Sequence, residues 1–409
     1  MQLKILYLVP CSPAGKAFGT RMRVRQIGSA LQALGTVDTM VVADGDEGDV
    51  TGADDAALPV RRVIRLRPIT NRSPFNRLRC GIDPAFLGYH GRHVPPDDRS
   101  EVLDHLEHYD LVWIYQLSTA DAFGRWRWPR SVLDFNDVPS TVLQTQARHG
   151  DSASDRLRAR LHIPVARCRE GLAQSRFTTL CVCSGADANR LPMKRTVQVI
   201  PNGFPRPLRE SVRRPARPPR IGFVGTFEYP PNVEGVRWFI ETCWPTITRA
   251  QPDVQLRLIG AGGGTPGVVP DGSANVTALG WVDDAESEIA TWSMMIVPLR
   301  MSGGTRVKIA EGLSRRCPIV STSFGAQGYD ARDGREMLLS DTGTDFAAAC
   351  IGLLRQPDRA AAIAERGWNA FLEHWTWDAL RPAVSSAVDD CLRRERSLRQ
   401  REGVPCAES

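Results

Sequence analysis

The sequence has no run of 18 apolar residues, no CxxC pair and only four lysines, and each absence excludes a class of protein. Without a long apolar run, no segment is predicted to cross a membrane. The ten cysteines are scattered, which favours buried thiols in a reducing compartment over a disulfide framework or a zinc site. The opening "MQLKILYLVP" is too short for a signal peptide and has no small-residue cleavage site. We therefore expect a cytoplasmic protein whose chain begins with a strand.

Positive charge is carried almost entirely by arginine, because lysine occurs only at Lys4, Lys16, Lys194 and Lys308. The formal net charge of +6 over 409 residues is a mild bias toward anionic partners. No basic helix with interleaved aromatic residues stands out, so nucleic-acid binding is not expected. The histidines form no HExxH motif, and no metal site is predicted. Since there is no GxSxG motif either, covalent catalysis has no candidate residue.

The chain is longer than one ordinary core accommodates, so two domains are expected. Short apolar runs alternate with helical periodicity through both halves, a pattern typical of βαβ units with parallel strands. The predicted strands of the first half are Leu3–Val9, Val37–Val42, Leu111–Tyr115, Ser131–Phe135, Thr178–Cys183 and Val197–Ile200, and a helix is predicted at Arg23–Leu34. The predicted strands of the second half are Ile221–Val224, Gln255–Ile259, Val276–Leu279, Met294–Pro298 and Ile319–Ser321. Its predicted helices are Asn232–Trp244, Ala285–Trp292, Thr305–Ser314, Asp345–Leu354, Ala360–Glu373 and Asp378 to about Gln400.

A composition break separates the two series at "PRPLRESVRRPARPPR", residues 205–220. Proline continues neither a helix nor a central strand, so this segment is predicted to be a linker, with a hinge around Arg213–Pro219. We expect an N-terminal Rossmann-like domain over 1–205, the linker over 206–219, a C-terminal Rossmann-like domain over 220–380, and a C-terminal helix and tail over 381–409. Because ligands bind at the carboxyl ends of parallel strands, the active site is expected in a cleft between the two domains.

The segment most suggestive of chemistry is "MSGGTRVKIAEGLS", residues 301–314. It follows a predicted buried strand and runs into a helical pattern, so its glycines lie in a strand-to-helix turn. Such a turn leaves up to about four backbone N–H groups unpaired at the positive end of the helix dipole, where an anion binds. Lys308 and Glu311 share one face of the predicted helix. Lys308 then adds charge beside a phosphate, and Glu311 accepts the hydroxyl groups of a ribose.

Purely structural explanations of these residues stay open. The glycines can form a tight turn capped by Thr305, and Lys308 can form an intrahelical salt bridge with Glu311. A second glycine loop, Gly225 and Thr226 in "GFVGTFEYPPN", follows the first strand of the C-terminal domain and is a reasonable phosphate or sugar contact. The run "GAGGG" at 260–264 starts no helix, so a flexible loop is favoured there over a dinucleotide fingerprint.

Several segments of the second half, taken in order, resemble the C-terminal domain of the GT-B glycosyltransferases called group 1 or family 4, which are retaining and use nucleotide-sugar donors. They are "RIGFVGTFEYPPNVEGVRWF", "PDVQLRLIGAG", "VTALGWVDD", "MIVPLRMSGGTRVKIAEGLSRRCPIVST", "GLLRQP" and "FLEHWTWD", and they cover nearly all of residues 220–380. The first half resembles the family more loosely, in "KILYLVPCSPAGKAFGTRMRVRQIGSAL", "LDFNDVPS" and "SGAD…VIPNGFP". The resemblance implies an α/β fold of two Rossmann-like domains facing across a cleft, with the C-terminal helix crossing back to the N-terminal domain.

The resemblance also implies roles around the opening of the predicted helix. Glu311 stands where the motif glutamate of the family holds the donor ribose. Gly303, Gly304 and Thr305 occupy the loop whose backbone faces the diphosphate and the sugar.

Further donor contacts are implied in three other loops. Gly225 and Thr226 match the loop after the first strand of the C-terminal domain, and Gly19 matches the corresponding loop of the N-terminal domain. Trp281 and Val282 stand where backbone groups of the family read the nucleobase.

Three departures from the family pattern bear on function. Gly303 stands where members with a Glu-x7-Glu motif have their first glutamate, which removes an expected contact to the donor sugar. The Arg and Lys that often follow the first strand of the C-terminal domain are missing, so Arg306 and Lys308 have to supply the charge beside the diphosphate. Asn136, next to Asp137, replaces a histidine that many relatives carry in the acceptor half, and these two residues are the candidates for positioning the acceptor hydroxyl.

These observations predict a glycosyltransferase of hexosyltransferase type that moves a sugar from a nucleoside-diphosphate sugar to a glycan, lipid-linked or small-molecule acceptor in glycan, polysaccharide or glycoconjugate biosynthesis. We expect retention and no metal cofactor, with helix N-termini and Lys308 stabilising the leaving diphosphate. The residues predicted to be catalytic are Lys308, Glu311, Asp137 and Asn136. Two alternatives stay open: a non-catalytic nucleotide-sugar or glycan-binding GT-B subunit, and a GT-B sugar-nucleotide epimerase or phosphorylase.

The basic, aromatic stretch at residues 71–93 belongs to the predicted acceptor half and is compatible with a peripheral contact with the inner face of the plasma membrane or with facing an acceptor, although a solvated loop is the simpler interpretation.

Overall fold

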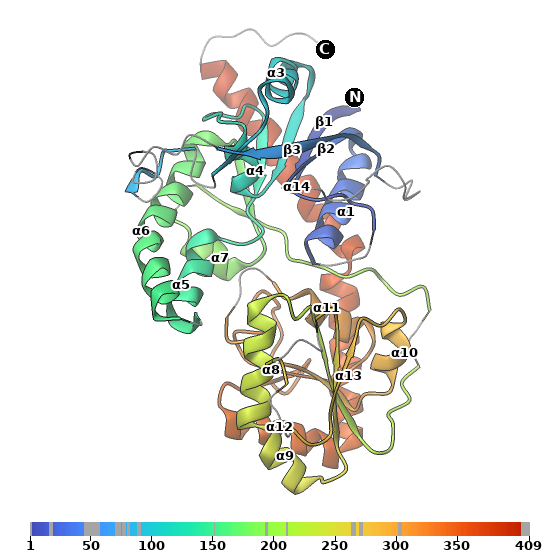
Figure 1. The fold of residues 1–409 in the computed structure, drawn as a ribbon. Helices are drawn as coiled ribbons and strands as arrows, with labels where there is room; N and C mark the ends of the chain where they lie inside the picture. The colour runs from blue at the N-terminus through green and yellow to red at the C-terminus, as the bar shows by residue number, and fades with distance from the viewer. Residues whose placement is uncertain are drawn as a thin grey trace. The chain divides into compact units, whose positions relative to one another are not determined.

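The computed structural model describes residues 2–15, 19–44, 58–69, 75, 79, 82–87, 91–150, 152–192, 195–209, 212–262, 267–269, 273–301 and 305–401. By their contacts these residues form two compact units (Figure 1). The first unit comprises Met1–Ile200 together with Leu380–Ser409, and the second comprises Pro201–Ala379. Each unit is an α/β domain built on its own sheet, as the alternating sequence pattern predicts.

The sheet of the first unit has the strand order β4-β3-β2-β1-β5-β6-β7-β8, and every neighbouring pair is parallel except β3 with β4. Its strands are β1 Leu3–Val9, β2 Gly35–Asp44, β3 Val60–Pro68, β4 Arg92–His93, β5 Leu111–Tyr115, β6 Ser131–Asp134, β7 Thr179–Val182 and β8 Gln198–Val199. The central strands β1 and β5 are almost entirely buried, which explains why their apolar runs were readable from the sequence.

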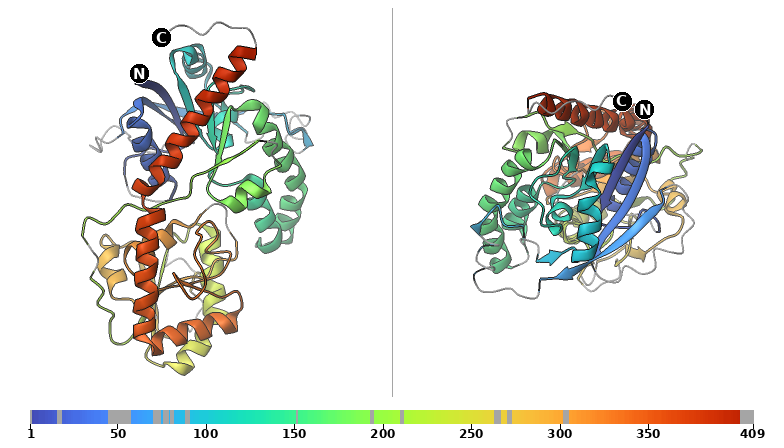
Figure 2. Two further views of the ribbon diagram at one scale, coloured as in Figure 1. Left: turned by 180° about the vertical axis from the view of Figure 1, so that it is seen from behind. Right: turned by 90° about the horizontal axis from the view of Figure 1, so that it is seen from above.

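Helices cover the faces of this sheet (Figures 1 and 2). They are α1 Gly19–Gln32, α3 Pro96–Asp104, α4 Leu117–Ala122, α5 Pro139–His149, α6 Ala153–Arg176 and α7 Gly185–Arg190, with a 3₁₀ turn at Leu106–His108. The sequence pattern did not reveal β3, α5 or α6. Arginines occupy much of β3 and α6, and Pro164 lies inside α6, so neither segment has a clean apolar period.

The last helix, α14 (Trp377–Arg401), starts in the second unit and belongs to the first unit from Leu380 onward. Figure 2 shows it running alongside the strands of the first unit. The Thr179 hydroxyl donates to Oδ2 of Asp390 at 2.8 Å, and the Arg130 N–H donates to Oε1 of Glu395 at 2.8 Å. These bonds join the helix to β6 and β7.

The sheet of the second unit has six parallel strands in the order β11-β10-β9-β12-β13-β14. They are β9 Arg220–Val224, β10 Gln255–Ile259, β11 Val276–Gly280, β12 Met294–Val297, β13 Ile319–Ser321 and β14 Leu338–Leu339. The helices are α8 Pro230–Thr242, α9 Trp244–Ala250, α10 Ala285–Ala290, α11 Val307–Ser314, α12 Gly343–Arg355 and α13 Pro357–Ala370, followed by a π-helical turn at Phe371–Trp375.

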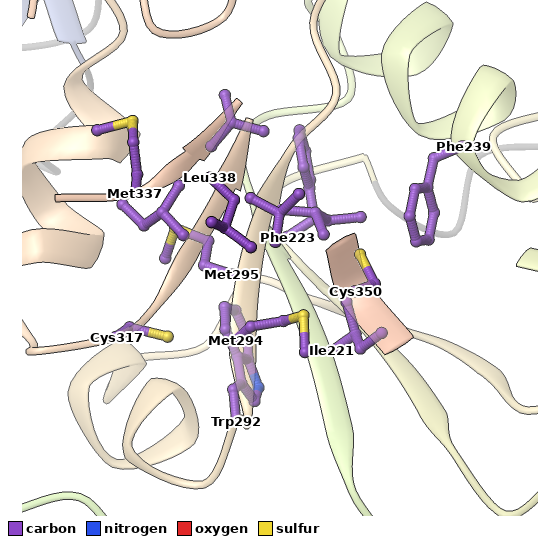
Figure 3. Close-up of a cluster of buried hydrophobic side chains, with 14 of the residues drawn as sticks. Ile221, Phe223, Phe239, Trp292, Met294, Met295, Cys317, Met337, Leu338 and Cys350 are labelled. Carbon is purple, nitrogen blue, oxygen red and sulfur yellow. The ribbon is translucent and has the colours of Figure 1, made fainter. Parts of the chain in front are cut away.

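The core of the second unit is built from strand side chains and from the helices that cover them (Figure 3). Trp292 is fully buried, and its ring lies against Gly222 so closely that a Cβ there would meet ring carbons at 2.0 Å. Cys317 and Cys350 belong to the same core. All described cysteines other than Cys168 are buried and free, which fits the expectation of buried thiols.

The division into units differs from the predicted boundaries in the proline-rich segment. The first unit ends at Ile200 rather than at 205, and the expected linker over 206–219 falls within the second unit. The expected hinge region is hydrogen-bonded there, because the N–H groups of Arg214 and Ala216 donate to the carbonyls of Ala290 and Thr291 at 2.9 and 2.8 Å. Proline excluded regular structure from this segment, but its backbone is still hydrogen-bonded to the last residue of α10 and to the residue after it.

Candidate functional site

Three loops of the second unit meet at the carboxyl ends of its central strands. The first strand, β9, pairs with β10 on one side and with β12 on the other. From β9 the chain continues to β10 on one side of the sheet, whereas from β12 it continues to β13 on the other side. Parallel sheets bind ligands in the crevice at such a switch point. The predicted donor residues Gly225 and Thr226 follow β9, whereas Thr305 and α11 follow β12.

The loops after β9 and β10 approach each other closely. Gly260 has a φ of +137°, and a Cβ there would lie 2.0 Å from the carbonyl oxygen of Gly225. Only glycine fits that backbone conformation and spacing. Gly225 is also closely surrounded, because a Cβ there would lie 2.7 Å from Nδ2 of Asn232 and 2.8 Å from Nζ of Lys308, which are the ends of two flexible side chains.

The Lys308 side chain extends from the first turn of α11 to this glycine loop. Its Nζ donates a hydrogen bond to Oδ1 of Asn232 at 2.7 Å and lies 3.9 Å from the centre of the Phe223 ring. The amide of Asn232 in turn donates to the carbonyl of Thr226 at 2.6 Å. We call Gly225, Thr226, Asn232 and Lys308 the β9 cradle.

The environment of Lys308 lowers its basicity. Burial, aided by the nearby positive charge of Arg306, lowers the pKa of Lys308 to about 7, although Glu311 acts in the opposite direction. Neutral amide and aromatic partners do not replace the water that the ammonium group loses on burial. A bound anion stabilises the charged form, so this lysine is suited to a ligand that brings negative charge.

Glu311 lies one turn beyond Lys308 on α11, as the spacing predicts. Burial raises the pKa of the Glu311 carboxyl, with Arg315 and Lys308 opposing that shift. The intrahelical salt bridge considered from the sequence does not form, since Nζ of Lys308 bonds to Asn232 and no ion pair of Glu311 occurs in the described residues.

The beginning of α11 differs from the expected cap. The helix starts at Val307, and its N-cap Arg306 provides no side-chain hydrogen bond to the first turn. The Thr305 hydroxyl accepts from the N–H of Asn202 at 2.9 Å, so it does not cap the helix. Both Thr305 and Arg306 are buried, and the Arg306 guanidinium carbon lies 4.6 Å from the centre of the Phe324 ring.

The remaining predicted donor residues have different positions in the second unit. Trp281 and Val282 follow β11, which is separated from β9 by β10. Trp281 is 48% exposed, and its indole N–H donates to Oδ1 of Asp283 at 3.1 Å. Gly303 and Gly304 lie outside the described residues.

The predicted residues of the first unit stand at the carboxyl edge of its own sheet. Gly19 is exposed and begins α1. Asn136 and Asp137 follow β6, and Nδ2 of Asn136 donates to Oδ2 of Asp137 at 3.2 Å. Asn136 is buried with a φ of +53°, and Gln116, at the end of neighbouring β5, has a φ of +68°. Such strained residues on adjacent strand ends are common at functional sites.

A cavity of about 350 Å³ lies beside these two strand ends. Asp137, Gln116 and Gln146 line it together with the apolar side chains of Val142 and Leu143. Its walls come from the ends of β5 and β6 and from α5 and α6. The structure therefore places Asp137 in a pocket large enough for part of a small organic molecule.

Beneath this edge, Arg23 and Asp134 form a buried ion pair. Nε and Nη2 of Arg23 each donate to an oxygen of Asp134 at 2.9 Å, and both side chains are fully buried. Arg23 also donates to the carbonyl of Ile200 at 2.9 Å. The pair links α1, β6 and the end of β8.

Sequence reasoning missed Asn232, Phe223 and Gly260 as members of the second-unit site. Asn232 follows two prolines at the start of α8, and its local sequence gives no sign of a contact with Lys308. Phe223 is a buried core residue of β9, and nothing in the local sequence indicates that its ring contacts Lys308. The glycines after β10 were visible, yet only the tertiary structure shows that Gly260 packs on Gly225.

Two further observations concern metals and membranes. In the described residues, no three His, Cys, Asp or Glu side chains come together in a way that could hold a metal ion. Among the described helices, none is both long and apolar enough to span a bilayer.

The fold places the chain in a known structural class. It superposes on Anabaena Alr3699/HepE in complex with UDP and glucose with a TM-score of 0.65 at 15% identity, covering 95% of this chain and 100% of the other. It also matches sucrose-phosphate synthase from Thermosynechococcus elongatus (TM-score 0.62, 18% identity, 98% and 100% coverage). S. aureus TarM in complex with fondaparinux, alpha-GlcNAc-glycerol and UDP gives a TM-score of 0.66 at 8% identity, with 95% and 100% coverage. The shared fold is that of the GT-B glycosyltransferases.

Part of the sequence matches a known family. Residues 218–356 match the family described as "Glycosyl transferases group 1". This match and the shared GT-B fold confirm the resemblance to the group 1 glycosyltransferases and the predicted fold class. A protein of Klebsiella pneumoniae described as an uncharacterized 44.6 kDa protein in the cps region is 23% identical over 159 residues, 36% of this chain. The match spans 40% of the length of that relative.

Proposed function

We propose that this protein transfers a sugar from a nucleoside-diphosphate sugar to a hydroxyl group of an acceptor in glycan biosynthesis. The observation that carries the proposal is the β9 cradle, in which a lysine with a lowered pKa meets a side-chain-free glycine loop at a strand switch point. Such a site suits an anion that approaches the backbone closely.

In this proposal the diphosphate of the donor lies against Gly225 and the first turn of α11. Lys308 becomes fully protonated when the diphosphate binds, because a phosphate restores the charge stabilisation that burial removed. The N–H groups at the start of α11 add the positive end of the helix dipole. Glu311, one turn further along, is placed to accept hydrogen bonds from the ribose hydroxyls.

The transfer forms a bond between the acceptor oxygen and the anomeric carbon and breaks the bond from that carbon to the diphosphate oxygen. The nucleoside diphosphate leaves, and the acceptor proton passes to a phosphate oxygen of the leaving group. Lys308 and the helix N–H groups stabilise the charge that develops on the diphosphate, and each preorganised donor contributes about 10²–10³ in rate. We propose front-face attack with retention and without a metal cofactor.

We assign the acceptor to the first unit. Asp137 lines the 350 Å³ cavity and accepts from Asn136, which fixes the carboxylate at the cavity wall. In that position Asp137 orients an acceptor hydroxyl. The apolar side of the cavity, with Val142 and Leu143, favours acceptors that carry an apolar group next to the reacting sugar or alcohol.

UDP-sugars are the first donors to test, because the Anabaena and S. aureus proteins named above are described in complex with UDP. A thermal-shift panel of nucleotide sugars tests donor binding, since a ligand at about 100 times its dissociation constant adds about 2.7 kcal/mol of stability. The stabilising donor is then assayed for hydrolysis and for transfer to glycan, lipid-linked and small-molecule acceptors. No shift with any nucleotide sugar contradicts the proposal.

The same assay separates the alternatives. Tight donor binding without hydrolysis or transfer to any acceptor indicates a non-catalytic binding subunit. This alternative is tested because Gly303 stands where the family motif has a glutamate. Conversion of the donor without an acceptor into an isomeric nucleotide sugar indicates an epimerase. Formation of a sugar phosphate from the donor and inorganic phosphate, or from a glycan and inorganic phosphate, indicates a phosphorylase.

A further inference from the structure

The second unit has another cavity, at the edge of its sheet opposite the β9 cradle. Its volume is about 720 Å³, and it is lined by Pro219, Ser293 and Pro318, which directly precede the strands β9, β12 and β13. The proline-rich segment before β9 forms one wall, and the helices α12 and α13, labelled in Figure 1, form another. We call this space the amino-edge cavity. Since Gly225 and α11 follow the carboxyl ends of β9 and β12, the cavity is separate from the proposed donor site.

Short apolar side chains make room for this cavity. On α13, Ala360, Ala361 and Ala364 line it, and their methyl groups leave the space in front of the strand ends open. Leu353 and Leu354 of α12 extend the apolar wall. Small-molecule sites in proteins have volumes of about 300–1,000 Å³ and mostly apolar linings with a few polar groups. The amino-edge cavity has the size and the lining to hold the hydrocarbon part of an organic molecule.

The charged side chains that line the cavity are three arginines and one glutamate. Glu365 on α13 places Oε2 at 3.7 Å from Nε of Arg316. Arg213 donates to two backbone carbonyls, which are neutral. Arg217 is exposed, and no carboxylate in the part of the chain that the structure describes forms an ion pair with it. Three positive charges against one negative charge leave the cavity wall with two positive charges in excess.

Arg316 stands at a backbone position that normally favours glycine. It follows Arg315, the C-cap of α11, and has a φ of +49°. Helices commonly end with a glycine in this left-handed conformation. Its guanidinium carbon lies 5.0 Å from the centre of the Trp368 ring, which holds the side chain at the cavity wall. Strained residues of this kind concentrate at sites that bind ligands.

We infer that the amino-edge cavity binds an amphipathic organic phosphate, a molecule with a hydrocarbon part and one phosphate monoester group. The alanine and leucine walls surround the hydrocarbon, and Arg217 and Arg316 bind the phosphate, for which arginine offers paired N–H donors. A phosphate monoester fits the excess charge better than a carboxylate does, because it carries nearly two negative charges above about pH 7. The inference does not rest on the proposed transfer reaction, whose donor binds at the other edge of the sheet.

Isothermal titration of the full chain with decyl phosphate at pH 8 tests this inference. The probe is used below its micelle concentration, so that it binds as a single molecule, and one equivalent should bind per chain. Decanoate, with one charge, should bind more weakly. Both 1-decanol, which lacks the charge, and inorganic phosphate, which lacks the hydrocarbon, should bind at least about tenfold more weakly than decyl phosphate. Saturating uridine diphosphate should not displace the probe.

Two variants with matched controls locate the ligand. Ala361→Phe should weaken the binding of decyl phosphate by about tenfold or more, because the ring takes the space of several methylene groups. Ala362→Phe, at an exposed neighbour on α13 that does not line the cavity, should bind normally. Arg217→Gln should weaken decyl phosphate by about tenfold and leave 1-decanol unchanged. Its control is Arg214→Gln, at an exposed residue of the same segment outside the cavity. The melting temperature without ligand shows that each variant is folded.

Four results would overturn the inference. Absence of binding by decyl phosphate means that the cavity does not take an amphipathic phosphate. Equal affinities in the wild type and in Ala361→Phe mean that the probe binds elsewhere. Equal affinities for decyl phosphate and 1-decanol mean that the arginines have no part in binding. Displacement by uridine diphosphate means that the probe occupies the donor site, a result that leaves the proposed function intact.

Discussion

The ammonium nitrogen of Lys308 lies 2.7 Å from Oδ1 of Asn232, although the two residues are 76 positions apart in the sequence. Asn232 also holds the carbonyl of Thr226, so a single amide joins the loop after β9 to the helix after β12. Donor binding in the proposed function depends on this connection, because it positions the cation beside the glycine loop.

Replacing Lys308 by alanine should weaken nucleoside diphosphate binding by about 1–3 kcal/mol, the range for losing a charge-assisted hydrogen bond. Isothermal titration with the diphosphate measures the change. Lys4→Ala, which removes an exposed lysine from the first unit, serves as the control. An unchanged affinity in Lys308→Ala would remove the lysine from the proposed site.

The affinity for a nucleotide sugar should decrease as the pH rises above about 7. Burial lowers the pKa of Lys308 to about 7, and a bound diphosphate raises it again. Binding above pH 7 therefore takes up a proton, and the affinity falls by up to about tenfold per pH unit until the pKa of the complex is reached. A nucleotide sugar is the right probe, since its diphosphate does not titrate in this range. Lys308→Arg keeps its charge and should show a flat profile, and a flat wild-type profile contradicts the assignment.

Gly225→Ala should weaken donor binding while leaving the domain folded. The added methyl group would lie within 3 Å of the amide of Asn232 and the ammonium group of Lys308, and both are ends of flexible side chains that can move aside. The melting temperature should change little, whereas the donor affinity should fall by at least tenfold, in line with the loss of one charged contact. The matched control is Gly352→Ala on α12, where a Cβ meets nothing within 4 Å. That variant should gain about 0.5–1 kcal/mol of stability and bind normally.

Glu311→Ala should separate recognition of the ribose from recognition of the diphosphate. The carboxylate lies one turn beyond Lys308 and is proposed to contact the ribose hydroxyls, so uridine diphosphate should bind about tenfold or more weakly. Inorganic pyrophosphate, which has no ribose, should compete as well as before in a displacement assay. Equal losses for both ligands would point to damage to α11 instead.

Asp134→Asn should destabilise the first unit by about 3–5 kcal/mol, because it leaves the buried guanidinium group of Arg23 without its countercharge. Calorimetric unfolding measures the effect. Arg61→Gln breaks the more exposed ion pair with Asp38 and should cost no more than about 1 kcal/mol. Equal losses of stability in the two variants would mean that the buried ion pair stabilises the first unit no more than an exposed ion pair does.

The accuracy of the sequence-based prediction varied with the chemistry of each segment. Leu111–Tyr115 was predicted to the residue, because a strand buried on both faces has a continuous apolar run. Gln255–Ile259 was also predicted to the residue, and its polar and apolar residues alternate as in a half-buried strand. The helix α6 was missed, because its arginines and Pro164 break the period on which the prediction relies. The start of α11 lies at Val307 and not at Thr305 as predicted, and the Thr305 hydroxyl bonds to Asn202, far away in the sequence, whereas the end at Ser314 was predicted correctly.

The sequence by itself determined that this chain forms two α/β units of mainly parallel strands, that Gly225 stands in a strand-to-helix turn, and that Lys308 and Glu311 lie on the helix after a second such turn. Those conclusions follow from local periodicity, which each segment carries within itself. Only the tertiary structure decided that Asn232 and Phe223 surround Lys308, and that its pKa falls to about 7. Burial and contact depend on which strands become neighbours in the sheet, and no local pattern contains that information.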